Sequence, residues 1–230
     1  MTEQRNSHAP VITVDGPSGT GKGTLAGRIA NRLGWHLLDS GALYRVVAYS
    51  AKQHRVEIAD TDGLRALAHT LPVTFSEADG EVHVVFEGHD VTPEIRSEEA
   101  GRAASEVAAV PAVREALLAR QREFQQPPGL VADGRDMGTV VFPHADLKIY
   151  LTASPEIRAE RRYKQLKQKG ISVNLARLLE DICDRDRRDE QRAVSPLRPA
   201  SDAITLDTTA LDITAVDDHI TALISQRGIA

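Results

Sequence analysis

The sequence predicts an α/β fold built on a doubly wound, five-stranded parallel sheet. Five short apolar segments alternate with helical patterns along the chain, which is typical of a parallel sheet covered by helices on both faces. A glycine-rich bend follows the first apolar segment directly, and a separate hairpin pattern interrupts the alternation once. Ligands of doubly wound sheets bind beyond the carboxyl ends of the strands. Residues just after the strands are therefore the candidates for function.

Composition narrows the class of protein. The 230 residues, 41% of them hydrophobic, suffice for one large domain, which we take to span residues 1–230. A net charge of −5 and 4% aromatic residues disfavour binding of a nucleic-acid polymer. Cys183 is the only cysteine, which excludes an internal disulfide and suits a reducing compartment. No apolar run approaches the roughly 18–20 residues of a membrane span. We expect a cytoplasmic monomer with no membrane partner.

Apolar runs and turn residues set the expected elements. The five strands of the main sheet are expected at 11–14, 35–38, 130–132, 147–151 and 203–206. Helices are expected at 24–33, 42–53, 64–68, 98–109, 111–125 and 155–168, after Asn174, and at 215–226. Gly34 can end the first helix, Pro111 divides two others, and Ser154-Pro155 is typical of a helix start. Strands at 73–75 and 82–86, with a turn at 77–80, predict a hairpin with its own small sheet.

The bend after the first strand has the spacing of a phosphate-binding loop, G-x-x-x-x-G-K. Glycines let backbone N–H groups approach phosphate oxygens, the following helix directs its positive end at the anion, and Lys22 adds a charge. Gly23 stands where the strict pattern has Ser or Thr, so Thr24 is expected to hold Mg²⁺ directly or only through water. The candidate phosphate ligands are Gly16, Pro17, Ser18, Gly19, Thr20, Gly21, Lys22, Gly23 and Thr24.

Charged residues follow two other predicted strands. Asp133 comes directly after a buried strand, where a carboxylate can hold Mg²⁺ directly or through water. Arg135 and Asp136 follow at once, and Arg45 lies past the neighbouring strand. Guanidinium groups bind phosphate in a bidentate manner, so these arginines predict a second phosphate site at the same edge.

Twelve of the 28 basic residues fall between Arg158 and Arg198. In the helix after Asn174, positions 185, 188, 189 and 192 share a face, and an apolar stripe at 175, 178, 179, 182 and 183 is expected to fix the opposite face to the core. Together with the preceding basic helix, these residues predict a lid that neutralises a transferring phosphate.

The motifs as a set resemble the bacterial cytidylate kinases over about residues 10–210. The resemblance is carried by Gly16–Thr24, Leu38-Asp39-Ser40-Gly41-Ala42-Leu43-Tyr44-Arg45, Asp133-Gly134-Arg135-Asp136-Met137-Gly138-Thr139 and Arg185-Asp186-Arg187-Arg188-Asp189. It implies the P-loop nucleoside monophosphate kinase fold, with a monophosphate-binding insertion at 62–108 and a helical lid at 157–170. It also implies transfer of the γ-phosphoryl group of Mg²⁺-bound ATP to CMP or dCMP.

By this resemblance each candidate residue receives a role. Arg158 joins the loop in binding ATP and belongs with Arg162 to the lid. Lys22, Arg135, Arg162 and Arg188 act on the transferring group. The implied CMP site comprises Ser40, Arg45, Arg135 and Arg188 around the phosphate, Ser105, Arg114 and Asp136 at the base, and Arg185 and Asp189 at the sugar.

Two other functions stay open at this point. A kinase of the same fold could act on UMP, AMP or a small hydroxylated acid. A nucleotide-binding switch or sensor with little turnover is the other alternative, although the guanine-binding string Asn-Lys-x-Asp of GTPase switches is absent.

Overall fold

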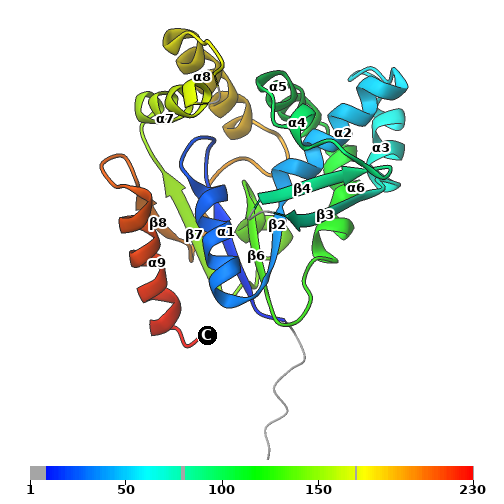
Figure 1. The fold of residues 1–230 in the computed structure, drawn as a ribbon. Helices are drawn as coiled ribbons and strands as arrows, with labels where there is room; N and C mark the ends of the chain where they lie inside the picture. Colours follow the sequence, from blue (N-terminus) through cyan, green and yellow to red (C-terminus); the bar gives the residue numbers. More distant parts are fainter. Residues whose placement is uncertain (1–8, 79–80, 169, 230) are drawn as a thin grey trace, which may run out of the picture.

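The computed structural model describes residues 9–78, 81–168 and 170–229 and contains the predicted five-stranded parallel sheet (Figure 1). The strand order is β2-β6-β1-β7-β8, and every neighbouring pair is parallel. The strands are β1 (Val11–Asp15), β2 (His36–Asp39), β6 (Leu130–Gly134), β7 (Leu147–Thr152) and β8 (Ile204–Asp207). Because β1 is central and parallel to its neighbours, its carboxyl end lies between the carboxyl ends of β6 and β7.

Two apolar cores cover the two faces of this sheet, because successive side chains of each strand point to opposite faces. On one face Ile12 and Val14 pack with Ile149 and with apolar side chains of α1 (Lys22–Leu33) and α9 (Ile213–Gln226). On the other face Val11 and Leu130 pack with α2 (Ser40–His54), α3 (Thr61–His69) and α6 (Pro111–Arg122). The sheet is therefore wound on both faces, as predicted.

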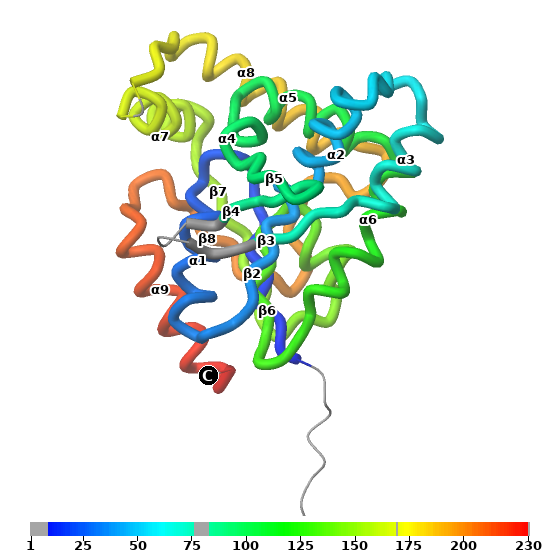
Figure 2. The backbone as a smooth tube through the Cα atoms, turned by 45° about the vertical axis from the view of Figure 1, so that its right-hand side comes forward, coloured from blue at the N-terminus to red at the C-terminus, as the bar shows by residue number. Residues whose placement is uncertain are grey.

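The expected hairpin forms a second sheet, β3-β4-β5, which is separate from the main sheet (Figure 2). Its strands are β3 (Val73–Ala78), β4 (Glu81–Phe86) and the unpredicted β5 (His89–Asp90). The centre of the predicted turn, 79–80, lies outside the described residues, as do residues 1–8. The short α4 (Thr92–Ile95), also unpredicted, and α5 (Glu98–Val107) follow. All of these elements fall within 62–108.

Two helices follow β7. The first, α7 (Pro155–Gln168), contains most of the predicted lid and begins at the helix start that Ser154-Pro155 predicted. The second, α8 (Leu175–Glu190), is the predicted helix after Asn174, whose side chain caps it. Figure 1 shows this pair above the carboxyl end of β7, across from α4 and α5. Among the described residues, no helix combines the length and apolar character needed to cross a membrane.

One unpredicted element lies at the carboxyl ends of the strands. After β6 the chain forms a π-helical turn, η1 (Met137–Val141). The side chain of Asp15, at the end of β1, accepts hydrogen bonds from the backbone N–H groups of Met137 (2.9 Å) and Gly138 (2.8 Å). These bonds satisfy N–H groups that the first turn of a helix leaves without partners. The contact joins residues over a hundred positions apart, so no local pattern could predict it.

Truncation of an isoleucine should cost far more stability in the core of the sheet than in a surface loop. Ile149→Ala removes a side chain that is 1% exposed in β7, and we expect a loss of about 2–5 kcal/mol in the free energy of unfolding. Ile58→Ala, at a position that is 42% exposed, should change it by less than about 0.5 kcal/mol. Urea unfolding followed by circular dichroism measures both. Equal losses would contradict this placement of the core.

Candidate active site

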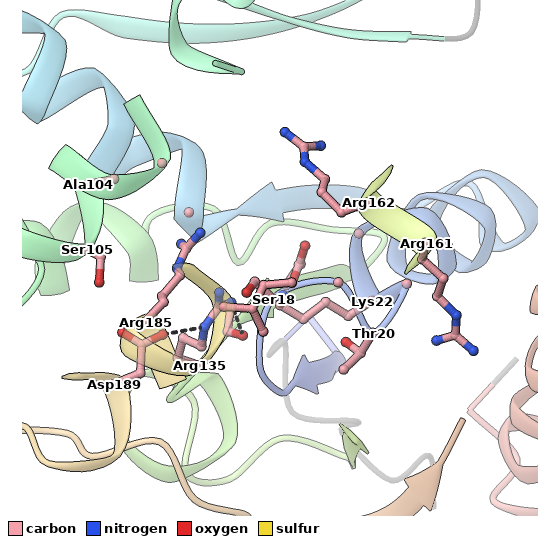
Figure 3. A pocket seen from close by; sticks show the side chains of 18 of the residues that line it. Ser18, Thr20, Lys22, Ala104, Ser105, Arg135, Arg161, Arg162, Arg185 and Asp189 are labelled. Atoms are coloured by element: carbon pink, nitrogen blue, oxygen red, sulfur yellow. Dashed lines mark hydrogen bonds and ion pairs between the residues drawn. The ribbon is translucent and has the colours of Figure 1, made fainter. Parts of the chain in front are cut away.

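A cavity of about 870 Å³ opens at the carboxyl ends of β1, β2 and β6, between α5 and the α7–α8 pair (Figure 3). Most of the sequence-predicted site residues line it, and they come from segments far apart in the chain. They are Ser18, Gly19, Thr20, Gly21, Lys22, Gly23, Thr24, Ser40, Arg45, Ser105, Arg114, Asp133, Arg135, Asp136, Arg162, Arg185, Arg188 and Asp189. Gly16, Pro17 and Arg158 do not line it.

The loop after β1 has the backbone shape that its glycines suggest. Gly16 has φ +145°, and a Cβ there would lie 2.1 Å from the carbonyl oxygen of Leu151. Gly21, with φ +91°, precedes the first residue of α1, which is Lys22. The ammonium of Lys22 donates to the carbonyl of Pro17 at 3.2 Å. Burial, and then the charges of nearby arginines, lower the pKa of Lys22. A buried cation beside a helix N-terminus is suited to an anion.

Asp133 lies against this loop. A Cβ on Gly23 would lie 3.1 Å from Oδ2 of Asp133, so the glycine leaves room for the carboxylate. Burial raises the pKa of Asp133, and Oδ1 has no hydrogen-bond partner among the described residues. Thr24 is exposed to the same cavity. An unpartnered carboxylate oxygen beside a phosphate-binding loop is chemically suited to a hard cation such as Mg²⁺.

An arginine cluster follows the loop toward α8. Arg135 donates to Asp189 at 3.1 Å, and Figure 3 shows Arg185 beside this pair. Burial, and then the charge of Arg135, lower the pKa of Arg185 to about 9, and its Nε has no partner within the described part of the chain. Arg45 donates to the carbonyl of Ile95 at 2.6 Å. Several partly buried guanidinium groups with few carboxylates form a site for a multiply charged anion.

A second polar set lies deeper in the cavity. Arg114 and Asp136 form a buried ion pair, with side chains 7% and 4% exposed. Arg114 also donates to the carbonyl of Ala108 at 3.3 Å and lies over the ring of Tyr44, 5.5 Å from its centre. The buried hydroxyl of Ser105 has no partner among the residues described. A carboxylate, a guanidinium and a free hydroxyl can together recognise a flat, polar ring.

The contact between Asp15 and η1 holds this second set in place. Asp136 directly precedes the two N–H groups that Asp15 binds, so the bonds fix where Arg135 and Asp136 leave the sheet. Burial raises the pKa of Asp15 to about 7. Sequence reasoning gave Asp15 no role, because it saw only a residue that ends a strand. Its position at the end of a predicted strand was the one available signal.

Arg161 and Arg162 leave α7 in opposite directions, as Figure 3 shows. Arg162 donates to Glu98 of α5 and to Gln165 of its own helix, each at 2.6 Å. Arg161 donates to the carbonyls of Thr208 (2.5 Å) and Leu211 (3.1 Å), after β8. Apolar residues just before α9 and in its first turn, which the sequence did not single out, form a further wall of the cavity; they are Leu211, Ile213 and Val216.

The predicted orientation of α8 is wrong. We expected the apolar stripe to face a core and the charged face to lie opposite it. Leu178 and Ile182 are buried, yet they line the same cavity as Arg185 and Asp189. Their spacing of three or four residues places all four on one face. The stripe is also shorter than expected, because Leu175 is 41% exposed and Cys183 only partly buried.

Arg158, which the resemblance placed at ATP, is buried and bonded to protein groups, one of which is the carbonyl of Ser18 in the loop. Its role toward ATP stays a prediction. Arg192, which the resemblance left without a role, lines the cavity beside Asp189.

Comparisons with known proteins identify the family of the chain. The family model for cytidylate kinase matches residues 12–226. A cytidylate kinase of Pseudomonas savastanoi pv. phaseolicola (strain 1448A / Race 6) is 60% identical over 224 residues, covering 96% of this chain and 98% of that protein. The cytidylate kinase of Pseudomonas fluorescens (strain SBW25) is 59% identical over 228 residues, with 98% and 99% covered. That of Pseudomonas aeruginosa (strain UCBPP-PA14) is 56% identical over 225 residues, with 97% and 98% covered. The chain belongs to the cytidylate kinase family.

Proposed function

We propose that the protein transfers the γ-phosphoryl group of ATP to CMP or dCMP, giving ADP and CDP or dCDP. The observation that carries this proposal is the shared cavity: a phosphate-binding loop at one end, the Arg114–Asp136 pair beside Ser105 at the other, and arginines between them. Family membership and relatives named cytidylate kinase support the same reaction.

The deeper set matches cytosine among the pyrimidines. Cytosine offers an amine donor at N4 and acceptors at N3 and O2. Asp136 accepts a hydrogen bond from the amine, while Arg114 and the Ser105 hydroxyl donate to the acceptors of the ring. Uracil would direct its O4 acceptor at the buried carboxylate of Asp136, and such a mismatch discriminates strongly. The ring of Tyr44 and the carbonyl of Ala108 hold Arg114 in place for this contact.

The chemistry between the two ends is alignment and neutralisation of charge. The phosphate of CMP is ionised near neutral pH, so it attacks without a general base. Lys22, Arg135 and Arg188 stabilise charge on the transferring group, and Arg162 joins them when it leaves Glu98. Ser40 and Arg45 hold the acceptor phosphate, while Arg185 and Asp189 lie at the sugar. The adenine of ATP fits the apolar wall after β8.

Asp133 and Thr24 are the residues that would hold Mg²⁺. Oδ1 of Asp133, which has no partner among the described residues, fits this role, and Thr24 follows Gly23 in the same cavity. The ion would shield the phosphate charges of ATP. The carboxylate form of Asp133 also raises the pKa of Lys22 and so favours the protonated lysine. The monomeric state, the cytoplasmic location and the absence of polymer and membrane partners stay predictions from the sequence.

The direct test measures ADP formation from Mg-ATP with CMP, dCMP, UMP, AMP and GMP in parallel, beside a sample without acceptor. We expect turnover with CMP and dCMP well above the others. Turnover with a different acceptor would keep the phosphoryl transfer and reject the proposed base site. ADP release without an acceptor, or none at all, would reject the proposal in favour of an ATPase or a sensor.

The free hydroxyl of Ser105 permits a clean test of base reading. Ser105→Ala removes a buried group that has no partner in the described part of the protein, so thermal stability should hold. Loss of a hydrogen bond to the base should raise KM for CMP by about 5- to 100-fold, with KM for ATP unchanged. Ser50→Ala, equally buried in α2 but away from the cavity, is the control. Unchanged KM for CMP in Ser105→Ala would remove Ser105 from the site.

The lowered pKa of Lys22 predicts proton uptake when the donor binds. A triphosphate adds negative charge beside the ammonium and raises its pKa, so at pH 8 the complex should hold more protons than the free protein. Calorimetric titration of a non-hydrolysable Mg-ATP analogue in HEPES and in Tris measures this uptake.

The Lys22→Met variant should lose the difference between the buffers. Lys52→Met, which removes an exposed lysine of α2, should keep it. Proton release by the parent protein, or an unaltered buffer difference in Lys22→Met, would contradict the assignment.

A further inference from the structure

Arg158 is a buried arginine that the proposed chemistry does not use. Its side chain is 3% exposed, although it lies in the strongly basic helix α7. The guanidinium donates through Nε to the carbonyl of Ala153 (2.9 Å) and through one terminal nitrogen to the carbonyl of Ser18 (3.1 Å). Ser18 is part of the phosphate-binding loop, and Ala153 lies between β7 and α7. Arg158 thus fastens the loop to the start of the predicted lid.

The same guanidinium binds a third segment. Both terminal nitrogens of Arg158 donate to the carboxylate of Asp186, at 3.1 and 2.5 Å, in a bidentate pair. The Asp186 side chain is only 14% exposed. It belongs to α8, directly after Arg185 and two residues before Arg188. The position of this one carboxylate therefore sets where two arginines of the cavity stand relative to the phosphate-binding loop.

The packing around Arg158 leaves little freedom for this arrangement. A Cβ on Gly19 would lie 3.0 Å from the Cβ of Arg158, so the loop and α7 are in close contact there. The planar guanidinium offers donors in a fixed fork, which the single ammonium of lysine cannot reproduce. Contact with three segments at once requires an arginine and a short carboxylate.

We propose that Arg158 and Asp186 are positioning residues that fix α8 to the phosphate-binding loop, so that the α8 arginines meet the phosphate held by that loop. This inference rests on the proposed function. It predicts a division of labour between the two side chains. Asp186 serves only the α8 side, because Arg158 keeps its bonds to Ala153 and Ser18 without it. Arg158 serves both the loop and α8.

The test compares kinetics and donor binding in substituted proteins. In Asp186→Asn the neutral amide weakens the anchor of α8, and we expect kcat to fall and KM for CMP to rise, each by about 10- to 100-fold. The Kd of a non-hydrolysable Mg-ATP analogue should stay at the parent value. Arg158→Lys should impair donor binding as well. The double variant should raise KM for CMP no more than Arg158→Lys alone, because both changes remove one interaction.

Asp184→Asn is the matched control. Asp184 lies two positions from Asp186 on α8 and pairs with Arg187, but both side chains are more than 60% exposed. This variant should behave as the parent protein in every measurement. Asp186→Glu provides a second variant if Asp186→Asn does not fold, because it keeps the charge and lengthens the side chain by one methylene. We expect it to retain most thermal stability and to lose kcat.

The outcomes separate this inference from the proposed function. Parent kinetics in Asp186→Glu or Asp186→Asn would overturn the inference, as would equal losses of donor and acceptor affinity in Asp186→Asn. Additive effects in the double variant would also overturn it. A parent protein that does not phosphorylate CMP would instead reject the proposed function, which the same assay reveals before any variant is compared.

Discussion

The concentration of positive charge at one edge of the sheet is the constraint on which the rest of the site depends. Besides burial, the charge of Arg135 lowers the pKa of both Lys22 and Arg185, and the charge of Arg185 further lowers the pKa of Lys22. Burying like charges together costs free energy unless carboxylates or a bound anion compensate. Asp133 and Asp189 compensate only part of this charge. The positive charge that remains favours binding of phosphate groups, which neutralise it.

Carboxylates around the cavity differ in what they do for this cluster. Asp189 bonds directly to Arg135 and so orients a guanidinium. Asp15 forms no ion pair with an arginine among the described residues; it binds backbone N–H groups of η1 and thereby sets the position of the segment that carries Arg135 and Asp136. Asp136 completes the set by neutralising Arg114 away from the phosphates. Each of these three carboxylates thus has a different role: one orients a side chain, one places the backbone and one neutralises a buried charge.

The sequence predicts what is local and periodic. The sheet, the loop from Gly16 to Thr24 and the start of α7 follow from alternation, glycine spacing and helix caps. The orientation of α8 does not, because apolar spacing identifies a buried face without revealing whether a core or a cavity covers it; Leu178 and Ile182 face the cavity. Buried polar contacts such as Asp15 with η1 join distant segments, and a sequence pattern has no means of pairing them.

The ion pairs of the α7–α8 segment differ in burial, and they therefore differ in the free energy needed to break them. Arg162–Glu98 and Arg188–Glu106 connect it to α5, and all four side chains are partly exposed. Exposed pairs contribute about 1 kcal/mol or less each, so a bound phosphate can displace them. Arg158–Asp186 is buried and held by further bonds, so its rupture costs more. The α7–α8 segment is therefore held more firmly at the phosphate-binding loop than at α5.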